Sequence, residues 1–348
     1  MGNWEDNVRK VVPYVPGEQP KMDNLIKLNT NENPYPPSPK VVGAKLDLDR
    51  LKLYPDPAAD MLVSAIADYH KVDKSRVFVG VGSDDVLAMS FMSFFNSGKP
   101  ILFPDVTYSF YDVWADMLHI PYKTVALDED FCIRPGDYAC ENGGVVFPNP
   151  NAPTGIALSS DKVREIIDAN RDVVCIVDEA YVDFGGETVL PLVDEYDNLL
   201  VVRTFSKSRS MAGIRIGYAI GQEKLIKYLS DVKYSYNSYT MNMPSIVLGT
   251  KSIEDDDYFK AQIKKVEATR ERTAAELEKL GFTVLPSKAN FVFASHRSKP
   301  AKEIFAAARE RGIILRYFDR PRIDNFLRIT IGTDAEMDTF IEFLKSFV

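Results

Sequence analysis

The sequence has few of the residues that build metal sites and disulfide frameworks. Its 348 residues include only three cysteines and three histidines. Cys132, Cys140 and Cys175 are odd in number and are not spaced as a metal knuckle, and no HExxH motif occurs. We therefore expect reduced thiols in a cytoplasmic protein, and no metal site.

Long apolar runs and an excess of positive charge are also missing. No stretch approaches the roughly 20 apolar residues that span a bilayer. The polar, acidic start Met1-Gly-Asn-Trp-Glu-Asp-Asn7 does not resemble a signal peptide. A net charge of -8 argues against a nucleic acid or an anionic membrane as a partner. Positive charge that serves a function must then be concentrated in a pocket.

Length and patterning predict two domains built from alternating strands and helices. A chain of 348 residues is too long for one simple core. Apolar runs predict strands, and apolar residues at helical spacing predict helices. The expected strands are 77–79, 100–103, 122–127, 145–147, 173–177, 199–202, 216–220, 282–285, 290–294, 312–315 and 326–331. The expected helices are 58–69, 86–95, 108–118, 160–169, 223–234, 242–280 (more than one), 300–311 and 334–347.

The stretch from Thr204 to Tyr218 is the strongest chemical signal. A buried strand leads directly to Ser206 and Lys207, and Arg215 follows eight residues after the lysine. A loop lysine is ordinarily a solvated side chain. At the carboxyl end of a strand in an α/β sheet, however, it lies where ligands bind. It could then form a Schiff base, while Ser206 and Arg215 hold a phosphate. The pattern predicts an anchor for pyridoxal 5'-phosphate (PLP).

Two further strand ends carry groups that suit the same ligand. The strand at 173–177 delivers Asp178 and Tyr181, although an acid there is often only a helix cap. The turn Gly80-Val-Gly-Ser-Asp-Asp85 joins a strand to a helix and offers backbone N–H groups to an anion. A Rossmann fingerprint needs a glycine at position 85, where this chain has aspartate. A phosphate is therefore expected there, and not a dinucleotide.

For several other segments the sequence allows more than one interpretation. Leu28-Asn-Thr-Asn-Glu-Asn-Pro34, in a proline-rich arm, is either a cluster of turns or a loop that closes over a pocket. Tyr108 is either a core aromatic or a side chain that stacks on a flat ring. In Asn149-Pro-Asn-Ala-Pro-Thr-Gly155 an X-Pro bond could be cis. Arg316 and Arg328 are strand arginines, which usually face solvent, and the alternation of their strands does not decide their direction.

The chain resembles the fold-type I PLP-dependent aminotransferases, and segments such as Tyr54-Pro-Asp-Pro57 and Phe326-Leu-Arg-Ile-Thr-Ile-Gly332 narrow this to the histidinol-phosphate aminotransferases. The wider resemblance rests on four motifs in this order. They are Gly82-Ser-Asp84, Asn149-Pro-Asn-Ala-Pro-Thr-Gly155, Asp178-Glu-Ala-Tyr181 and the Ser206-Lys207 pair with Arg215. The resemblance covers essentially the whole chain. It implies an arm (1–38) that packs on the small domain and a partner subunit, a large domain (39–240) with a mostly parallel α/β/α sheet, and a smaller α+β domain (241–348).

The resemblance also implies a role for each site residue. Lys207 would hold PLP and move the proton, Asp178 would pair with the ring nitrogen, and Tyr181 would contact the ring oxygen. Tyr108 would stack on the ring, and the phosphate would lie among Ser206, Arg215 and the backbone of Ser83 and Asp84. Tyr54 would reach into the site of a neighbouring subunit, which makes a homodimer. The family's asparagine before Pro-Thr-Gly is Ala152 here, so its contact with the ring oxygen is assigned to Asn151.

For the substrate, the resemblance implies amino-group exchange between glutamate and imidazole-acetol phosphate in histidine biosynthesis. Arg316 and Arg328 would bind the phosphate or carboxylate, and Tyr14 and Asn33 would line the substrate side. An aromatic amino acid aminotransferase and a PLP-dependent decarboxylase of threonine phosphate remain alternatives, as does a PLP-fold module without turnover. Such a regulator would normally carry a basic DNA-binding segment, and none is apparent.

Overall fold

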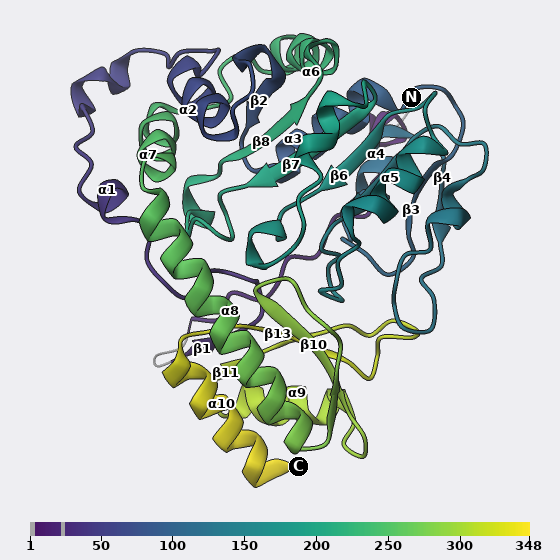
Figure 1. Cartoon of the computed structure of the whole chain (residues 1–348), viewed down its shortest axis with the longest axis vertical. Helices are drawn as coiled ribbons and strands as arrows, with labels where there is room; N and C mark the ends of the chain where they lie inside the picture. Colours follow the sequence, from purple (N-terminus) through teal and green to yellow (C-terminus); the bar gives the residue numbers. More distant parts are fainter. Residues whose placement is uncertain (1–3, 22–24) are drawn as a thin grey trace.

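The computed structural model describes residues 4–21 and 25–348 and shows two units of unequal size (Figure 1). The larger unit contains a seven-stranded sheet and the smaller unit a four-stranded sheet. Helix α8, Asp256–Lys279, runs from one unit to the other and carries the chain between them (Figure 1). The predicted α/β architecture with a large and a small unit is confirmed.

The seven-stranded sheet is mostly parallel. Its strands lie in the order β2-β8-β7-β6-β5-β3-β4, and only β8 runs antiparallel to its neighbours. The strands are β2 (Val77–Gly80), β3 (Ile101–Pro104), β4 (Tyr122–Val125), β5 (Val145–Pro148), β6 (Cys175–Asp178), β7 (Leu199–Thr204) and β8 (Gly217–Gly221). All of them except the edge strand β4 are buried along their length, as continuous apolar runs covered on both faces should be.

Helices cover both faces of this sheet. In β7, Leu199 and Val201 join one core cluster while Leu200 and Val202 join another, because successive side chains point to opposite faces. Helices α2, α5 and α7 contribute to the first cluster, and α3, α4 and α6 to the second. Their bounds are α2 (Asp60–His70), α3 (Ser83–Phe94), α4 (Tyr111–Leu118), α5 (Ser160–Asp168), α6 (Glu223–Tyr236) and α7 (Met243–Ile253).

The smaller unit is an antiparallel sheet packed against helices. Its strand order is β12-β13-β10-β9, with β9 (Phe282–Val284), β10 (Phe291–His296), β12 (Arg316–Tyr317) and β13 (Leu327–Thr330). Helices α8, α9 (Ala301–Glu310) and α10 (Asp334–Phe347) contribute to its core. The strand expected at 312–315 is β11 (Ile313–Ile314), and a separate strand, β12, begins at Arg316 in a different sheet.

The N-terminal arm connects the two units. Its strand β1 (Ile26–Lys27) pairs in parallel with β11, and α1 (Pro39–Val42) follows. Short 3-10 helices complete the described chain: η1 (Trp4–Asn7), η2 (Leu48–Lys52), η3 (Lys74–Arg76), η4 (Pro135–Tyr138), η5 (Val182–Phe184), η6 (Leu190–Asp194) and η7 (Ala212–Ile214). No helix in the described part of the chain is long and apolar enough to cross a membrane.

The division of the chain at residues 38 and 240 stays a prediction. Helix α7 packs against α2, and its Ile246 and Ile253 belong to the core of the larger unit. This packing favours a boundary near Glu254, between α7 and α8, in place of residue 240.

Buried Arg270 of α8 gives a test of how the two units are held together. Its Nη1 donates to the carbonyl oxygens of Phe184, in the larger unit, and Ala289, in the smaller one, at 2.7 and 2.9 Å. Arg270→Ala would leave both buried carbonyls without a donor, so we expect the free energy of unfolding to fall by about 2–4 kcal/mol in urea denaturation.

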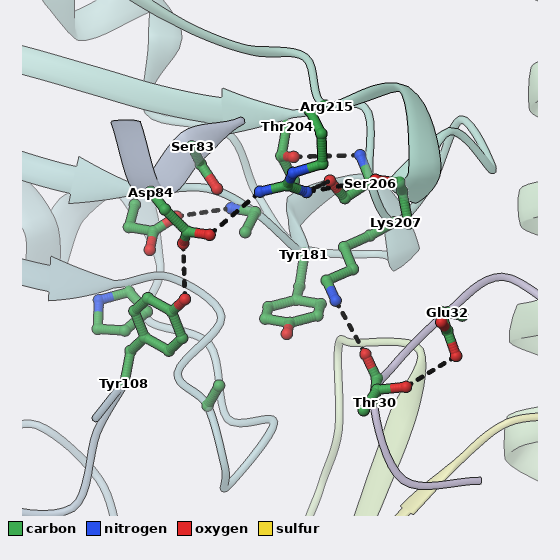
Figure 2. A pocket seen from close by; sticks show the side chains of 15 residues that line it. Thr30, Glu32, Ser83, Asp84, Tyr108, Tyr181, Thr204, Ser206, Lys207 and Arg215 are labelled. Carbon is green, nitrogen blue, oxygen red and sulfur yellow. Dashed lines mark hydrogen bonds and ion pairs between the residues drawn. The ribbon is translucent and has the colours of Figure 1, made fainter. Parts of the chain in front are cut away.

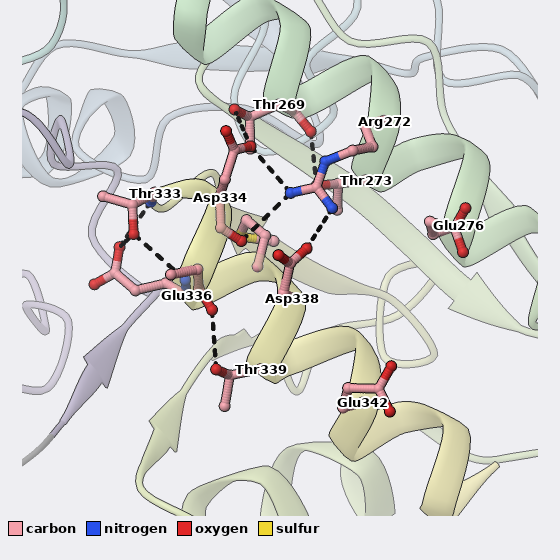
Figure 3. A network of polar contacts seen from close by, with 12 residues as sticks. Thr269, Arg272, Thr273, Glu276, Thr333, Asp334, Glu336, Asp338, Thr339 and Glu342 are labelled. Atoms are coloured by element: carbon pink, nitrogen blue, oxygen red, sulfur yellow. Dashed lines mark hydrogen bonds and ion pairs between the residues drawn. The ribbon is translucent and has the colours of Figure 1, made fainter.

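Arg272, two residues further along the same helix, is the matched control. It forms exposed ion pairs with Asp334 and Asp338 of α10 (Figure 3). Exposed ion pairs contribute about 0–1 kcal/mol, so Arg272→Ala should cost little. Equal losses in the two variants would contradict this account of the joint between the units.

Candidate functional site

Two neighbouring parallel strands bring the predicted catalytic residues to one edge of the sheet. Asp178 is the last residue of β6 and is paired with Val202 of β7. Lys207 lies three residues beyond the end of β7. Both side chains line one cavity, and Figure 2 shows Lys207 among the labelled residues of its wall. The lining residues are Thr30, Glu32, Ser83, Asp84, Tyr108, Pro148, Ala152, Asp178, Ala180, Tyr181, Thr204, Ser206, Lys207, Ala212 and Arg215.

The Lys207 amine is a cation held in a poorly hydrated place. Burial, followed by the positive charge of Arg328, lowers its pKa to about 8. Its Nζ donates to the backbone carbonyl of Thr30 at 3.0 Å, a residue of the N-terminal arm (Figure 2). At pH 7 roughly a tenth of this amine is therefore neutral, the form that a nucleophile or base requires.

The Asp178 carboxyl is the buried acid of the site. Burial raises its pKa to about 7, although two hydrogen bonds favour the charged form and oppose this rise. These bonds come from the Ala180 N–H and the Tyr111 hydroxyl, each at 3.1 Å. A positively charged group beside this carboxyl would keep it ionised.

An anion cradle lies at the opposite end of the cavity from the arm. Ser83 is the first residue of α3, so its N–H has no partner within the helix. This N–H lies at the positive end of the helix dipole, where an anion can bind. Arg215 Nη1 donates to Ser206 Oγ at 3.3 Å (Figure 2). A Cβ on Gly82, whose φ is +86°, would lie 2.5 Å from Arg215 Nη2, so the glycine permits this close approach.

Asp84 occupies part of the cradle with its side chain as well as its backbone. Its carboxylate accepts from Arg215 Nη2 at 3.2 Å and from the Tyr108 hydroxyl at 2.7 Å. An arriving phosphate would compete with this carboxylate for Arg215. Tyr108 lines the cavity, as the prediction of a ring contact requires.

A second cavity continues from the first, with Tyr181 and Lys207 in the wall of both. Tyr14, Arg316 and Arg328 line it, as predicted from the sequence. Arg328 Nη2 donates to the carbonyl of Asn29 at 2.8 Å, while its buried Nε has no partner. Burial, followed by the charge of Arg316, lowers the pKa of Arg328. Among the described residues of this cavity, no carboxylate forms an ion pair with the guanidinium group of Arg316 or of Arg328.

Three of the residues predicted for the site, Asn33, Tyr54 and Asn151, do not line either cavity. Asn151 is buried and its amide binds Val106, Thr107 and Thr154, so it does not face the cavity and the assignment to the ring oxygen is wrong. Ala152 is the residue of that turn that lines the wall. Both X-Pro bonds of the turn, Asn149-Pro150 and Ala152-Pro153, are cis.

Asn33 and Tyr54 are the other two. The Asn33 amide donates to the carbonyls of Lys207 and Ser208 at 3.2 and 3.3 Å, so it holds the lysine loop from behind and does not line the substrate side. Tyr54 is 81% exposed and stacks on Tyr239 outside the cavity. That position leaves its ring available to another subunit, and the contact itself stays a prediction.

The structure also adds residues that sequence reasoning missed. Thr30 and Asn31 line the cavities, and the Asn31 amide donates to the Tyr181 hydroxyl at 2.9 Å. The amide-rich composition of 28–34 was the available signal, and its interpretation as a loop over a pocket is correct. In the described residues no group of three or more His, Cys, Asp and Glu side chains could hold a metal ion.

The raised pKa of Asp178 gives a test by pH-dependent stability in the cofactor-free protein. Between about pH 4 and 7 the unfolded carboxyl has lost its proton while the folded one retains it. The free energy of unfolding therefore falls across this window and levels off above it. Asparagine does not titrate, so the free energy of unfolding of Asp178→Asn should not fall across this window. We expect the variant to be more stable than wild type at pH 8, by on the order of 3 kcal/mol, and about equally stable near pH 4. Urea denaturation at both pH values measures this, and a difference that does not grow with pH would contradict the burial argument.

Comparison with known proteins agrees with this geometry. The family model for aminotransferase class I and II matches residues 23–344. The histidinol-phosphate aminotransferase 2 of Dechloromonas aromatica is 54% identical over 98% of this chain and 98% of its own length. The histidinol-phosphate aminotransferase of Clostridium beijerinckii is 52% identical over 98% of this chain and 96% of its own. The crystal structure of the histidinol-phosphate aminotransferase from Clostridium acetobutylicum, 23% identical, shares the fold with a TM-score of 0.85 over 92% of this chain and 98% of its own. The chain belongs to the class I and II aminotransferase family.

Proposed function

We propose that this aminotransferase uses PLP to interconvert L-histidinol phosphate plus 2-oxoglutarate and imidazole-acetol phosphate plus L-glutamate, a step of histidine biosynthesis. The main support for the proposal is that two cavities join and share Tyr181 and Lys207 in their walls. Lys207, Asp178 and the Arg215 cradle face the first, and Arg316 and Arg328 face the second. The relatives that are about half identical over the full length support the same substrate.

The residues of the first cavity fit PLP group by group. Ser206, Arg215 and the start of α3 offer donors to a phosphate. Asp178 offers a carboxylate that would be fully ionised beside a protonated ring nitrogen. Lys207 offers an amine to an aldehyde. When bound, PLP supplies an electron sink for the charge left at the substrate carbon.

Lys207 has the properties of the group that moves the proton. Its pKa of about 8 leaves it able both to accept and to return a proton near neutral pH. The Thr30 carbonyl, 3.0 Å from Nζ, stabilises the protonated amine at the floor of the cavity. One amine serves both directions of transfer, so the two half-reactions can use the same site in turn, as a ping-pong order requires.

Arg316 and Arg328 explain how one site accepts two different substrates. Histidinol phosphate has a phosphate and no α-carboxylate, whereas glutamate has two carboxylates. Both present an anion at a distance from the amino group, and a guanidinium pair can bind either. Neither arginine is neutralised by a side-chain ion pair in the described structure, so both are available.

A spectrum of the PLP-loaded protein tests the proposed function. Histidinol phosphate should convert the visible absorption band to a near-ultraviolet band, and 2-oxoglutarate should restore it. Lys207→Ala should lose this interconversion. A response to phenylalanine or tyrosine alone would make the enzyme an aromatic aminotransferase, and release of carbon dioxide from threonine phosphate would make it a decarboxylase.

We further infer that the protein is a homodimer in the cytoplasm. Exposed apolar side chains gather before α2 and after α6 in the sequence, and Tyr54 of the first group stacks on Tyr239 of the second; they are Leu48, Leu51, Leu53, Tyr54, Tyr236 and Tyr239. Exposed apolar side chains in such number favour a partner, and a second copy would bring Tyr54 to the neighbouring cavity. The free thiols of Cys132, Cys140 and Cys175 suit a reducing compartment.

Substitution among these exposed apolar side chains tests the dimer. The double variant Leu51→Glu, Leu53→Glu places two charges on the surface, so we expect it to sediment at the 39.2 kDa of one chain and the wild type at twice that mass. Lys123→Glu on the edge strand β4 is the control and should remain dimeric. A wild-type protein that sediments as a monomer would contradict the proposal.

Arg328→Ala tests the shared anion site. We expect kcat/KM to fall by roughly 10²–10³ for histidinol phosphate and for glutamate alike, because both lose a charge-assisted pair. Arg320→Ala, an exposed arginine outside both cavities, is the matched control. Wild-type rates for Arg328→Ala in both half-reactions would show that the anion binds elsewhere.

A further inference from the structure

Three consecutive residues of the N-terminal arm each contact one functional side chain. The carbonyl of Asn29 accepts from Arg328, the carbonyl of Thr30 accepts from Lys207, and the side-chain amide of Asn31 donates to Tyr181. The first two contacts use the backbone, which almost any residue could supply. Only the third depends on the identity of a side chain, so Asn31 is the specific element of the arm.

The direction of the Asn31 amide is fixed by its surroundings. The Asn31 N–H donates to Thr330 Oγ1 at 3.0 Å, and the Thr330 hydroxyl donates back to Asn31 Oδ1 at 3.0 Å. With Oδ1 occupied in this way, the NH₂ group is the end that faces the Tyr181 oxygen, 2.9 Å away. The Asn31 carbonyl accepts from Asn290 Nδ2 at 3.0 Å, so the backbone of this buried residue is also held.

The backbone of Asn31 adds a second sign of constraint. Its φ is +55°, in the left-handed region that asparagine adopts more readily than most residues. A residue there with a different side chain would meet the strain and lose the contact with Tyr181 as well. Asn31 therefore suits this position in two ways: it adopts the left-handed backbone conformation, and its side-chain NH₂ group faces Tyr181.

A donor at one side of the Tyr181 oxygen determines what its own hydrogen can do. A phenolic O–H lies near the ring plane and has two in-plane directions, one of which is taken by the Asn31 donor. The hydrogen must then point in the other direction, toward the cavity that the Tyr181 side chain lines. Of the described residues in the wall of the first cavity, none is Asn or Gln, so no side-chain amide there can share a contact with the ring oxygen.

We propose that Asn31 is a positioning residue that turns the Tyr181 hydroxyl into a fixed hydrogen-bond donor toward the bound cofactor. The proposal rests on the proposed function, because it assigns the acceptor to the ring oxygen of PLP. A donor aimed at that oxygen stabilises negative charge on it and so lowers the pH at which the visible absorption band of the loaded protein titrates. Asn31 acts only through Tyr181 and does not touch the reacting atoms.

Asn31→Gly is the direct test, because glycine accepts the positive φ and removes the side-chain amide with its bonds to Tyr181 and Thr330. The PLP-loaded variant should show its visible band titrating roughly one pH unit higher than wild type, a tenfold change in proton affinity. Asn31→Asp keeps the size and replaces the donor with an acceptor, so it should raise the midpoint at least as far. It also serves if the glycine variant does not fold.

Asn29→Ala is the matched control. Asn29 is buried in the same segment, but its side-chain amide donates to the Glu18 carbonyl and accepts from Thr30 Oγ1, and it does not contact Tyr181. Its midpoint should equal that of wild type. An unchanged midpoint in both Asn31 variants, or the same shift in Asn29→Ala, would overturn the proposal. A wild-type protein with no visible band in the presence of PLP would instead overturn the proposed function, so the two failures are distinguishable.

Discussion

The parallel pairing of β6 with β7 is the constraint on which the site depends. It places the carboxyl ends of two buried strands at one edge of the sheet, so Asp178 and the loop that carries Lys207 open into one cavity. The same burial raises the pKa of the acid and lowers the pKa of the amine. Each group is thus displaced toward its neutral form, and a cofactor with a cationic ring and an aldehyde relieves both displacements.

The ionisable groups behind the cavity show how the strand pair is held in place. Arg203 of β7 forms a buried ion pair with Glu179, the residue after Asp178, at 2.7 Å. Ser208, the residue after Lys207, donates to Asp183 at 2.6 Å, and Asp183 also lies 3.5 Å from Arg203. One buried arginine therefore joins the loops that follow the two strands, and the polar residues adjacent to the catalytic ones have a structural reason to be there.

Much of the site could be predicted because it follows from local rules. Strand ends, the glycine turn before α3 and the spacing between Lys207 and Arg215 are all visible in the sequence, and the parallel-sheet rule brings them together. The contacts that could not be predicted join distant residues. Asn31 and Tyr181 are 150 positions apart, and Thr30 and Lys207 are 177 apart. Asn151 was wrongly assigned for the same reason, since its amide is directed by Val106 and Thr107 on another loop. The pairing of β11 with the arm strand β1 likewise joins segments that are distant in the sequence.

Chemical mapping of the anchor tests the central claim most directly. Borohydride reduction of the PLP-loaded protein, followed by trypsin and mass spectrometry, locates any lysine joined to the cofactor. The account predicts the label on Lys207, in the peptide Thr204-Phe-Ser-Lys-Ser-Arg209, because a modified lysine is not cleaved. A label on another lysine, such as Lys288, or no label on a folded protein, would contradict the assignment of Lys207 and with it the chemistry derived from the strand pair.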